Sequence, residues 1–102
     1  MDKNAALKSV KKYLDFLKVN KIDFQKAYVF GSYASGNFNE NSDIDLAIVF
    51  TELSNSFFMQ VELMKLGRKI DSRIEPHPFE EAEFTKSNPF ANEVITKGIP
   101  VI

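Results

Sequence analysis

The sequence predicts a single α/β domain in which helices pack against a small β-sheet. Its 102 residues match the usual length of one domain rather than two. Hydrophobic residues make up 44% of the chain, which is enough to build one core. Segments with helical periodicity alternate with short apolar runs typical of strands, and this alternation is characteristic of a sheet with helices packed on it.

The first third of the chain predicts an amphipathic helix followed by a central strand. Residues 4–20 carry apolar side chains at steps of three and four, and lysines fill the other side. The apolar positions are Ala6, Leu7, Val10, Leu14 and Leu17. A polar connector then leads to residues 27–30, a run short and apolar enough to be a central strand.

The middle of the chain predicts a second strand and a second long helix. Residues 43–50 form an apolar run that opens with two acids. Ser54 or Asn55 can cap the helix that follows, because short polar side chains accept hydrogen bonds from the first free N–H groups. Gly67 is expected to end this helix.

The last third predicts a third strand, two short helices and a closing edge strand. The third strand is expected at residues 68–75, and Pro76 and Pro78 are expected to end it. Short helices are expected at residues 79–86 and from Asn88-Pro89 to residue 96. The apolar residues 99–102 either pair within the same sheet or close a homodimer, and the sequence leaves both open.

Composition excludes several classes of function. Thirteen basic and 14 acidic side chains leave a net charge of −1, which argues against general nucleic-acid binding. The absence of cysteine excludes disulfides and thiolate metal sites. No apolar run approaches the roughly 18 residues of a membrane span, and the N-terminus lacks a signal-peptide pattern. We therefore expect a cytoplasmic protein with no membrane association.

A glycine turn after the first strand indicates a phosphate site. Gly31 and Ser32 directly follow the apolar run at residues 27–30. Glycine allows a sharp turn and a close approach of a ligand to the backbone. If Ser32 opens a helical turn, free N–H groups and the positive end of the helix point at an anion, and the hydroxyl adds a further donor.

Two acids at the start of the second strand indicate a divalent metal site. Asp43 and Asp45 point to the same face of a strand, about 7 Å apart, while Ile44 points to the other face. Two carboxylates on one face repel each other unless a positive charge lies between them. Mg²⁺ is the natural occupant, because it prefers oxygen ligands and is often held by one or two carboxylates together with substrate phosphates.

The combined motif resembles a known family. Gly-Ser, ten intervening residues and then Asp-Ile-Asp, with apolar flanks, is similar to the signature of the DNA polymerase β-type nucleotidyltransferase superfamily. The short length and the context Ser42–Val49 resemble its minimal members, the MNT domains. The resemblance covers residues 27–75, and we expect it to extend over the whole chain, residues 1–102, as one domain. It implies a mixed rather than all-parallel sheet with the palm architecture of that superfamily.

The resemblance also implies a third carboxylate on a neighbouring strand. The candidates are Asp71 and Glu75, which the predicted third strand places on one face with Arg73 between them. Asp71 matches the family pattern better and is preferred as catalytic residue and metal ligand, and Glu75 is the alternative. Tyr33 stands where many minimal members carry a basic residue, so we expect compensation from a partner chain or from Arg68, Lys69 or Arg73. Arg73 is the candidate to assist Gly31 and Ser32 in nucleotide binding.

The implied reaction is nucleotidyl transfer supported by two Mg²⁺ ions. Asp43, Asp45 and the third carboxylate hold the metals, and ATP or another nucleoside triphosphate gives up its nucleoside monophosphate, AMP in the case of ATP. The acceptor is a protein or a small molecule. The alternative is an antitoxin-type binding module that neutralises a HEPN-type toxin mainly by contact. His77 follows Glu75 closely and is either a nucleotide or acceptor contact or an ordinary loop residue.

Overall fold

The computed structural model describes residues 3–39 and 41–101, which form four strands, four α-helices and one short 3₁₀ helix. The sheet is mixed, as expected, with strand order β3-β2-β1-β4. Strand β1 is antiparallel to β2 and β4, whereas β2 and β3 are parallel. The elements in chain order are α1 (Lys3–Val19), β1 (Lys26–Phe30), α2 (Ser32–Ser35), β2 (Ile44–Phe50), α3 (Ser56–Arg68), β3 (Ile74–Glu80), η1 (Glu81–Glu83), α4 (Pro89–Lys97) and β4 (Ile99–Pro100).

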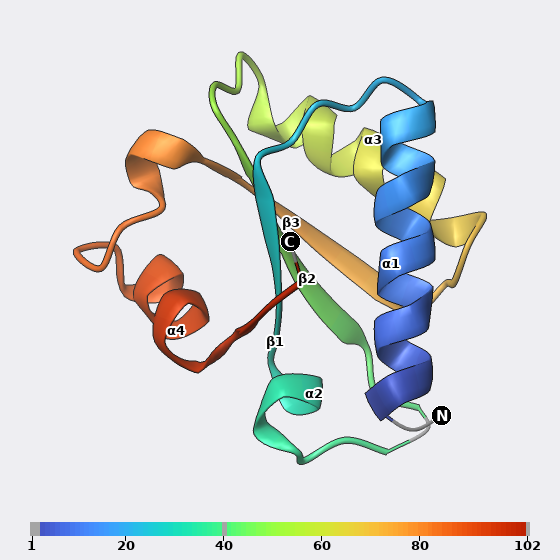
Figure 1. Cartoon of the computed structure of the whole chain (residues 1–102). Helices are drawn as coiled ribbons and strands as arrows, with labels where there is room; N and C mark the ends of the chain where they lie inside the picture. Colours follow the sequence, from blue (N-terminus) through green and yellow to red (C-terminus); the bar gives the residue numbers. More distant parts are fainter. Residues whose placement is uncertain (1–2, 40, 102) are drawn as a thin grey trace.

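The sheet lies between two helical layers. Helices α1 and α3 cover one face and α4 covers the other (Figure 1). The side chains of β2 alternate between these layers, so Leu46 and Ile48 enter the core under α1 and α3, while Ala47 and Val49 pack with α4. A strand buried on both faces explains why β2 is apolar without a break after Asp45.

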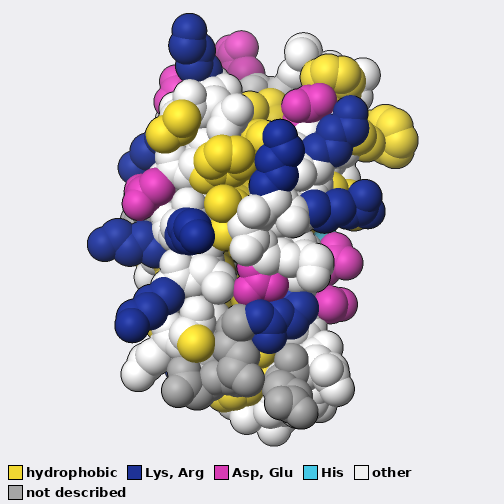
Figure 2. All heavy atoms as spheres, turned by 90° about the vertical axis from the view of Figure 1, so that its right-hand side faces the viewer, with side chains coloured by type: hydrophobic (Ala, Val, Ile, Leu, Met, Phe, Trp, Pro, Cys, Tyr) yellow, Lys and Arg dark blue, Asp and Glu magenta, His cyan; other side chains and the backbone are white. Residues whose placement is uncertain are grey.

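A buried hydrogen bond joins the two helices of the larger layer. The Tyr13 hydroxyl of α1 donates to the Leu63 carbonyl of α3 at 2.8 Å. Burial raises the pKa of Tyr13, because the phenolate loses its hydration in this core. The opposite side of α1 exposes Lys8, Lys11 and Lys12, and basic, acidic and hydrophobic side chains are interspersed over this outer face (Figure 2).

The prediction for the third strand was wrong in its boundaries. Helix α3 continues through Gly67 to Arg68, and β3 begins only at Ile74 and includes both prolines. The reason lies in the parallel ladder, in which the Ile44 N–H donates to the Arg73 carbonyl at 2.7 Å. Odd-numbered residues of β3 therefore direct their N–H groups toward β2, and Pro76 and Pro78 occupy the outward positions. Proline removes no ladder hydrogen bond there, so an edge strand tolerates it.

Most other boundaries agree with the sequence pattern. Asn55 caps α3 by accepting from the Phe58 N–H at 2.9 Å, and Asn88 caps α4 ahead of Pro89. The helix expected at residues 79–86 is reduced to η1, because its first residues belong to β3. The C-terminal strand pairs with β1 in its own sheet, with Ile99 opposite Val29, although residue 102 lies outside the described residues. No helix in the described part of the chain has the length and apolar character to cross a membrane.

Candidate active site

The glycine turn lies at the end of β1 and the start of α2. Gly31 has φ 73° and ψ −146°, a conformation that is essentially restricted to glycine. It redirects the chain from the strand into the single turn of α2. The N–H groups of Ser32 and Tyr33 open this turn and have no carbonyl of their own helix to bind. They are therefore available to an anion above the turn.

Tyr33, where a basic residue was expected from the resemblance, belongs to the core. Its side chain is 1% exposed, and its ring stacks on Phe38 at a centroid distance of 4.5 Å. Its hydroxyl donates to the Asn39 carbonyl at 3.4 Å. Tyr33 thus anchors the loop that separates the glycine turn from the two aspartates.

Asp45 lies directly beside the glycine turn. It is the register partner of Phe30 on β1, which places its carboxylate next to Gly31. A Cβ atom at Gly31 would overlap Asp45 Oδ2 and lie 3.2 Å from its carboxyl carbon. Glycine is therefore required at position 31 for two reasons. Its backbone conformation favours glycine, and a side chain there would enter the space that the Asp45 carboxylate occupies.

Asp43 precedes β2 and is exposed, whereas Asp45 is half-buried. Ile44 between them is completely buried in the core under α1. Because side chains alternate along a strand, Asp45 leaves β2 on the opposite side from Ile44. Asp43 precedes the strand, so its position on the same face as Asp45 stays a prediction.

Strand β3 contributes an acid, Glu75, beside Asp45. It is the register partner of Asp45 across the parallel β2–β3 pair. Neighbouring strands lie about 4.8 Å apart, and register partners present their side chains on the same face. Asp45 therefore has the glycine turn on the β1 side and a second carboxylate on the β3 side.

Asp71 is not on the strand, and the expectation that it shares a face with Glu75 was wrong. It lies in the turn before β3, where Arg73 Nε donates to its Oδ1 at 3.1 Å and Arg73 Nη2 to its Oδ2 at 2.9 Å. Partial burial raises the pKa of Asp71, but hydrogen bonds from the Arg73 backbone and guanidinium and from Ser9 outweigh it, and the net pKa is lowered. This ion pair holds the Arg73 guanidinium against Asp71 in the turn before β3, and the role of Arg73 in nucleotide binding stays a prediction.

His77 is the residue near Asp45 whose position the sequence left open. Its Nε2 lies 3.5 Å from Asp45 Oδ1, is buried, and makes no hydrogen bond within the described residues. The ring packs against Phe30 and Phe90 at centroid distances of 5.3 and 5.8 Å. Only the strand register could reveal this contact, because His77 lies opposite Ala47, two positions beyond the Asp45–Glu75 pair.

The donor set fits a hard divalent cation such as Mg²⁺. Asp43, Asp45 and Glu75 offer only carboxylate oxygens, which this ion prefers. The missing side chain of Gly31 leaves the space that Asp45 Oδ2 occupies. No three acidic, histidine or cysteine side chains in the described segments are already gathered as metal ligands. The carboxylates are thus neighbours whose convergence depends on side-chain rotation.

A mixed sheet that carries a glycine turn on one strand and acids on the next two defines a nucleotidyltransferase-type palm. The family model for polymerase beta nucleotidyltransferases matches residues 10–102. The chain belongs to this family.

Relatives in the family include a protein adenylyltransferase. Protein adenylyltransferase MntA of Shewanella oneidensis is 29% identical over 87 residues, or 85% of this chain. The chain spans 60% of the length of that curated relative.

Solved structures share the fold. A nucleotidyltransferase-type protein of Sulfolobus solfataricus superposes with a TM-score of 0.68 at 21% identity, over 96% of this chain and 80% of its own. A toxin–antitoxin complex with AMP-PNP gives 0.69 at 28% identity, over 90% of this chain and 71% of its own. An MntA–HpeT toxin–antitoxin mutant with two aspartates replaced by glutamate gives 0.66 at 23% identity, over 100% and 73%.

Proposed function

We propose that this chain transfers AMP from ATP to a protein acceptor. The observation that carries the proposal is the position of Asp45, whose carboxylate lies against Gly31 and opposite Glu75. This geometry supports a polyphosphate site at the glycine turn, beside a pair of acids on neighbouring strands. The similarity to a protein adenylyltransferase and to a toxin–antitoxin complex with AMP-PNP supports ATP as the donor and a protein, such as a toxin partner, as the acceptor.

Each residue has a role in this proposal. Ser32 and Tyr33 donate their N–H groups to the outer phosphates, and the Ser32 hydroxyl adds a third donor. Asp43, Asp45 and Glu75 would hold Mg²⁺, which when bound neutralises the phosphate charge and lowers the pKa of the attacking hydroxyl.

The reaction is a displacement at the α-phosphorus. The acceptor oxygen forms a bond to this atom, the bond to the bridging oxygen breaks, and pyrophosphate leaves with its electrons. Glu75 takes the proton of the acceptor hydroxyl, because it lies opposite Asp45 on β3, which is an edge strand of the sheet. We assign this role to Glu75 in preference to Asp71, whose oxygens are bound by Arg73.

The test uses ATP labelled at the α-phosphate, Mg²⁺ and a candidate acceptor protein. Label is expected on the acceptor, together with the mass gain of an adenylate, and ATP labelled at the γ-phosphate is expected to leave it unlabelled. The double variant Asp43→Asn, Asp45→Asn is expected to abolish labelling while binding of the acceptor persists. Asp15→Asn, on the exposed side of α1, is the matched control and is expected to label normally.

Two outcomes would reject the proposal. Unchanged labelling by the Asp43→Asn, Asp45→Asn variant would show that these acids do not carry the reaction. Absence of labelling by the unmodified chain, combined with neutralisation of a bound toxin, would leave the contact-only antitoxin as the function.

A further inference from the structure

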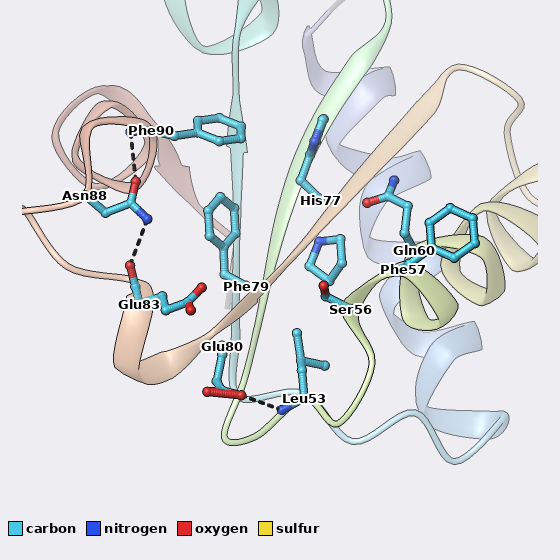
Figure 3. Close-up of a pocket in the computed structure, with 11 residues that line it drawn as sticks. Leu53, Ser56, Phe57, Gln60, His77, Phe79, Glu80, Glu83, Asn88 and Phe90 are labelled. Atoms are coloured by element: carbon cyan, nitrogen blue, oxygen red, sulfur yellow. Dashed lines mark hydrogen bonds between the residues drawn. The ribbon is translucent and has the colours of Figure 1, made fainter.

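A groove runs along the exposed edge of β3, outside the phosphate site. It has a volume of about 540 Å³ and lies between the N-terminal ends of α3 and α4. Its walls are aromatic, and two glutamates lie at the end away from His77 (Figure 3). The residues that define this edge groove are Phe57, His77, Phe79, Glu80, Glu83 and Phe90.

The edge of β3 does not offer main-chain pairing to a ligand. Pro76 and Pro78 stand at the outward positions of the ladder and have no N–H to donate. The Pro76 carbonyl is already bound by the Gln60 side chain. A partner that enters the edge groove must therefore be recognised by side chains rather than by an added strand.

The charge of the groove favours a cation. Of the residues that the structure describes, no lysine or arginine lines the groove, whereas Glu80 and Glu83 do. Glu80 accepts only the Leu53 N–H at 2.9 Å, and no ion pair neutralises either carboxylate within the described residues. Glu83 directs its carboxylate toward the groove (Figure 3). A triphosphate would be repelled here, whereas a guanidinium would find carboxylates and aromatic faces together.

One end of the groove reaches the candidate active site. His77 lines the groove and also lies 3.5 Å from Asp45 Oδ1. At the rim of the groove, the Phe57 side chain is 77% exposed. A large aromatic side chain on the surface is a common anchor for a protein partner. A chain segment held in the groove would thus present its neighbouring residues to Asp45 and Glu75.

We propose that the edge groove docks a basic segment of the protein acceptor, with an arginine side chain between the aromatic walls and the carboxylates of Glu80 and Glu83. This inference rests on the proposed function only in taking the acceptor to be a protein. Docking on the β3 edge would orient the acceptor hydroxyl toward Glu75, so the groove determines which acceptor is used.

The test measures binding in the absence of ATP and metal, so it is independent of transfer. The probe is a short fluorescent peptide with two arginines separated by glycine, compared with the same peptide carrying neutral citrulline. We expect the arginine peptide to bind about tenfold more tightly, since charge-assisted hydrogen bonds are about twice as strong as neutral ones. Titration of the isotope-labelled chain by NMR should shift the amide signals of Ser56, Phe57 and Glu83.

Matched variants separate the groove from its surroundings. Glu83→Gln and Phe57→Ala are each expected to weaken binding of the arginine peptide about three- to tenfold, by loss of the charge or of the aromatic wall. Glu81→Gln lies in the same 3₁₀ helix but outside the groove, and Phe58→Ala removes an aromatic ring that is 62% exposed but does not line it. Both controls are expected to bind as the unmodified chain does.

Three results would overturn the inference. Equal affinity for the arginine and citrulline peptides would show that charge does not select the occupant. Loss of binding in the controls as large as in Glu83→Gln and Phe57→Ala would place the peptide elsewhere. Shifts of the same amide signals by adenosine, with none by the peptide, would make the groove a nucleoside site. After any of these three results the labelling experiment with ATP could still succeed, so failure of this inference is distinguishable from failure of the proposed function.

Discussion

Gly31→Ala tests the geometry of the site through a single methyl group. The added Cβ would overlap Asp45 Oδ2, which is the oxygen that faces the glycine turn. Asp45 is half-buried, so its side chain can rotate away more easily than the β1–β2 ladder can open. The expected response is a displaced carboxylate in a domain that still folds.

The magnitude follows from two separate effects. A side chain held at φ 73° and ψ −146° costs about 1–3 kcal/mol, which in a domain of this size lowers Tm by about 5–20 °C. Displacement of a carboxylate that positions a metal or substrate typically lowers activity about 10- to 100-fold. We expect both losses in Gly31→Ala.

Gly36→Ala provides the matched control. Gly36 also has a positive φ, 87°, but no atom lies within 4 Å of the Cβ that would be added. This variant should lose about 1 kcal/mol of stability and keep its activity. Thermal unfolding and transfer of label from ATP are measured for both variants. Equal activity losses in the two, or full activity in Gly31→Ala, would refute the reasoning.

Three further experiments test the rest of the structure. Glu75→Gln should lower AMP transfer at least about 100-fold. Asp71→Asn should retain transfer but lose about 1–3 kcal/mol of stability, because this substitution breaks the charge-assisted hydrogen bonds with Arg73 in the turn. The reverse order of activities would make Asp71 the third carboxylate. Because burial raises the pKa of Tyr13, the contribution of this residue to stability is complete below the ordinary tyrosine pKa of about 10 and is lost as the pH rises above it. Denaturant midpoints should therefore fall above pH 10, and Tyr13→Phe should flatten that fall. An equally steep fall in Tyr13→Phe would contradict the burial of the hydroxyl. Replacing Pro78 by valine restores an outward N–H donor to the β3 edge and should produce concentration-dependent association in light scattering, whereas Pro76 is completely buried and is left unchanged. A monomeric Pro78→Val variant would contradict the assigned outward direction of this position.

Local pattern was sufficient to predict the glycine turn, the two aspartates and the strand that follows them. Gly31 and Ser32 form a turn between strand and helix, Asp43 directly precedes β2 and Asp45 lies within it, because turn chemistry and the two-residue period of a strand act over a few neighbours. The mixed sheet was predicted from the family resemblance rather than from the periodicity of the sequence.

The same local reasoning failed at β3. Two prolines suggested the end of a strand, whereas only the pairing partner determines whether a proline removes a hydrogen bond. With β3 placed too early, Asp71 was counted on the strand and Glu75 was ranked second.

What the sequence by itself determined is therefore local: a glycine turn between strand and helix, followed at a set distance by two aspartates, one before β2 and one within it. The tertiary structure alone decided which distant residues join them. The register between β2 and β3 places Glu75 opposite Asp45 and brings His77 to its other oxygen, while Asp71 turns to Arg73. Register is set by hydrogen bonds and core packing between segments far apart in the chain, and a shift of one residue would move every one of these side chains to the opposite face.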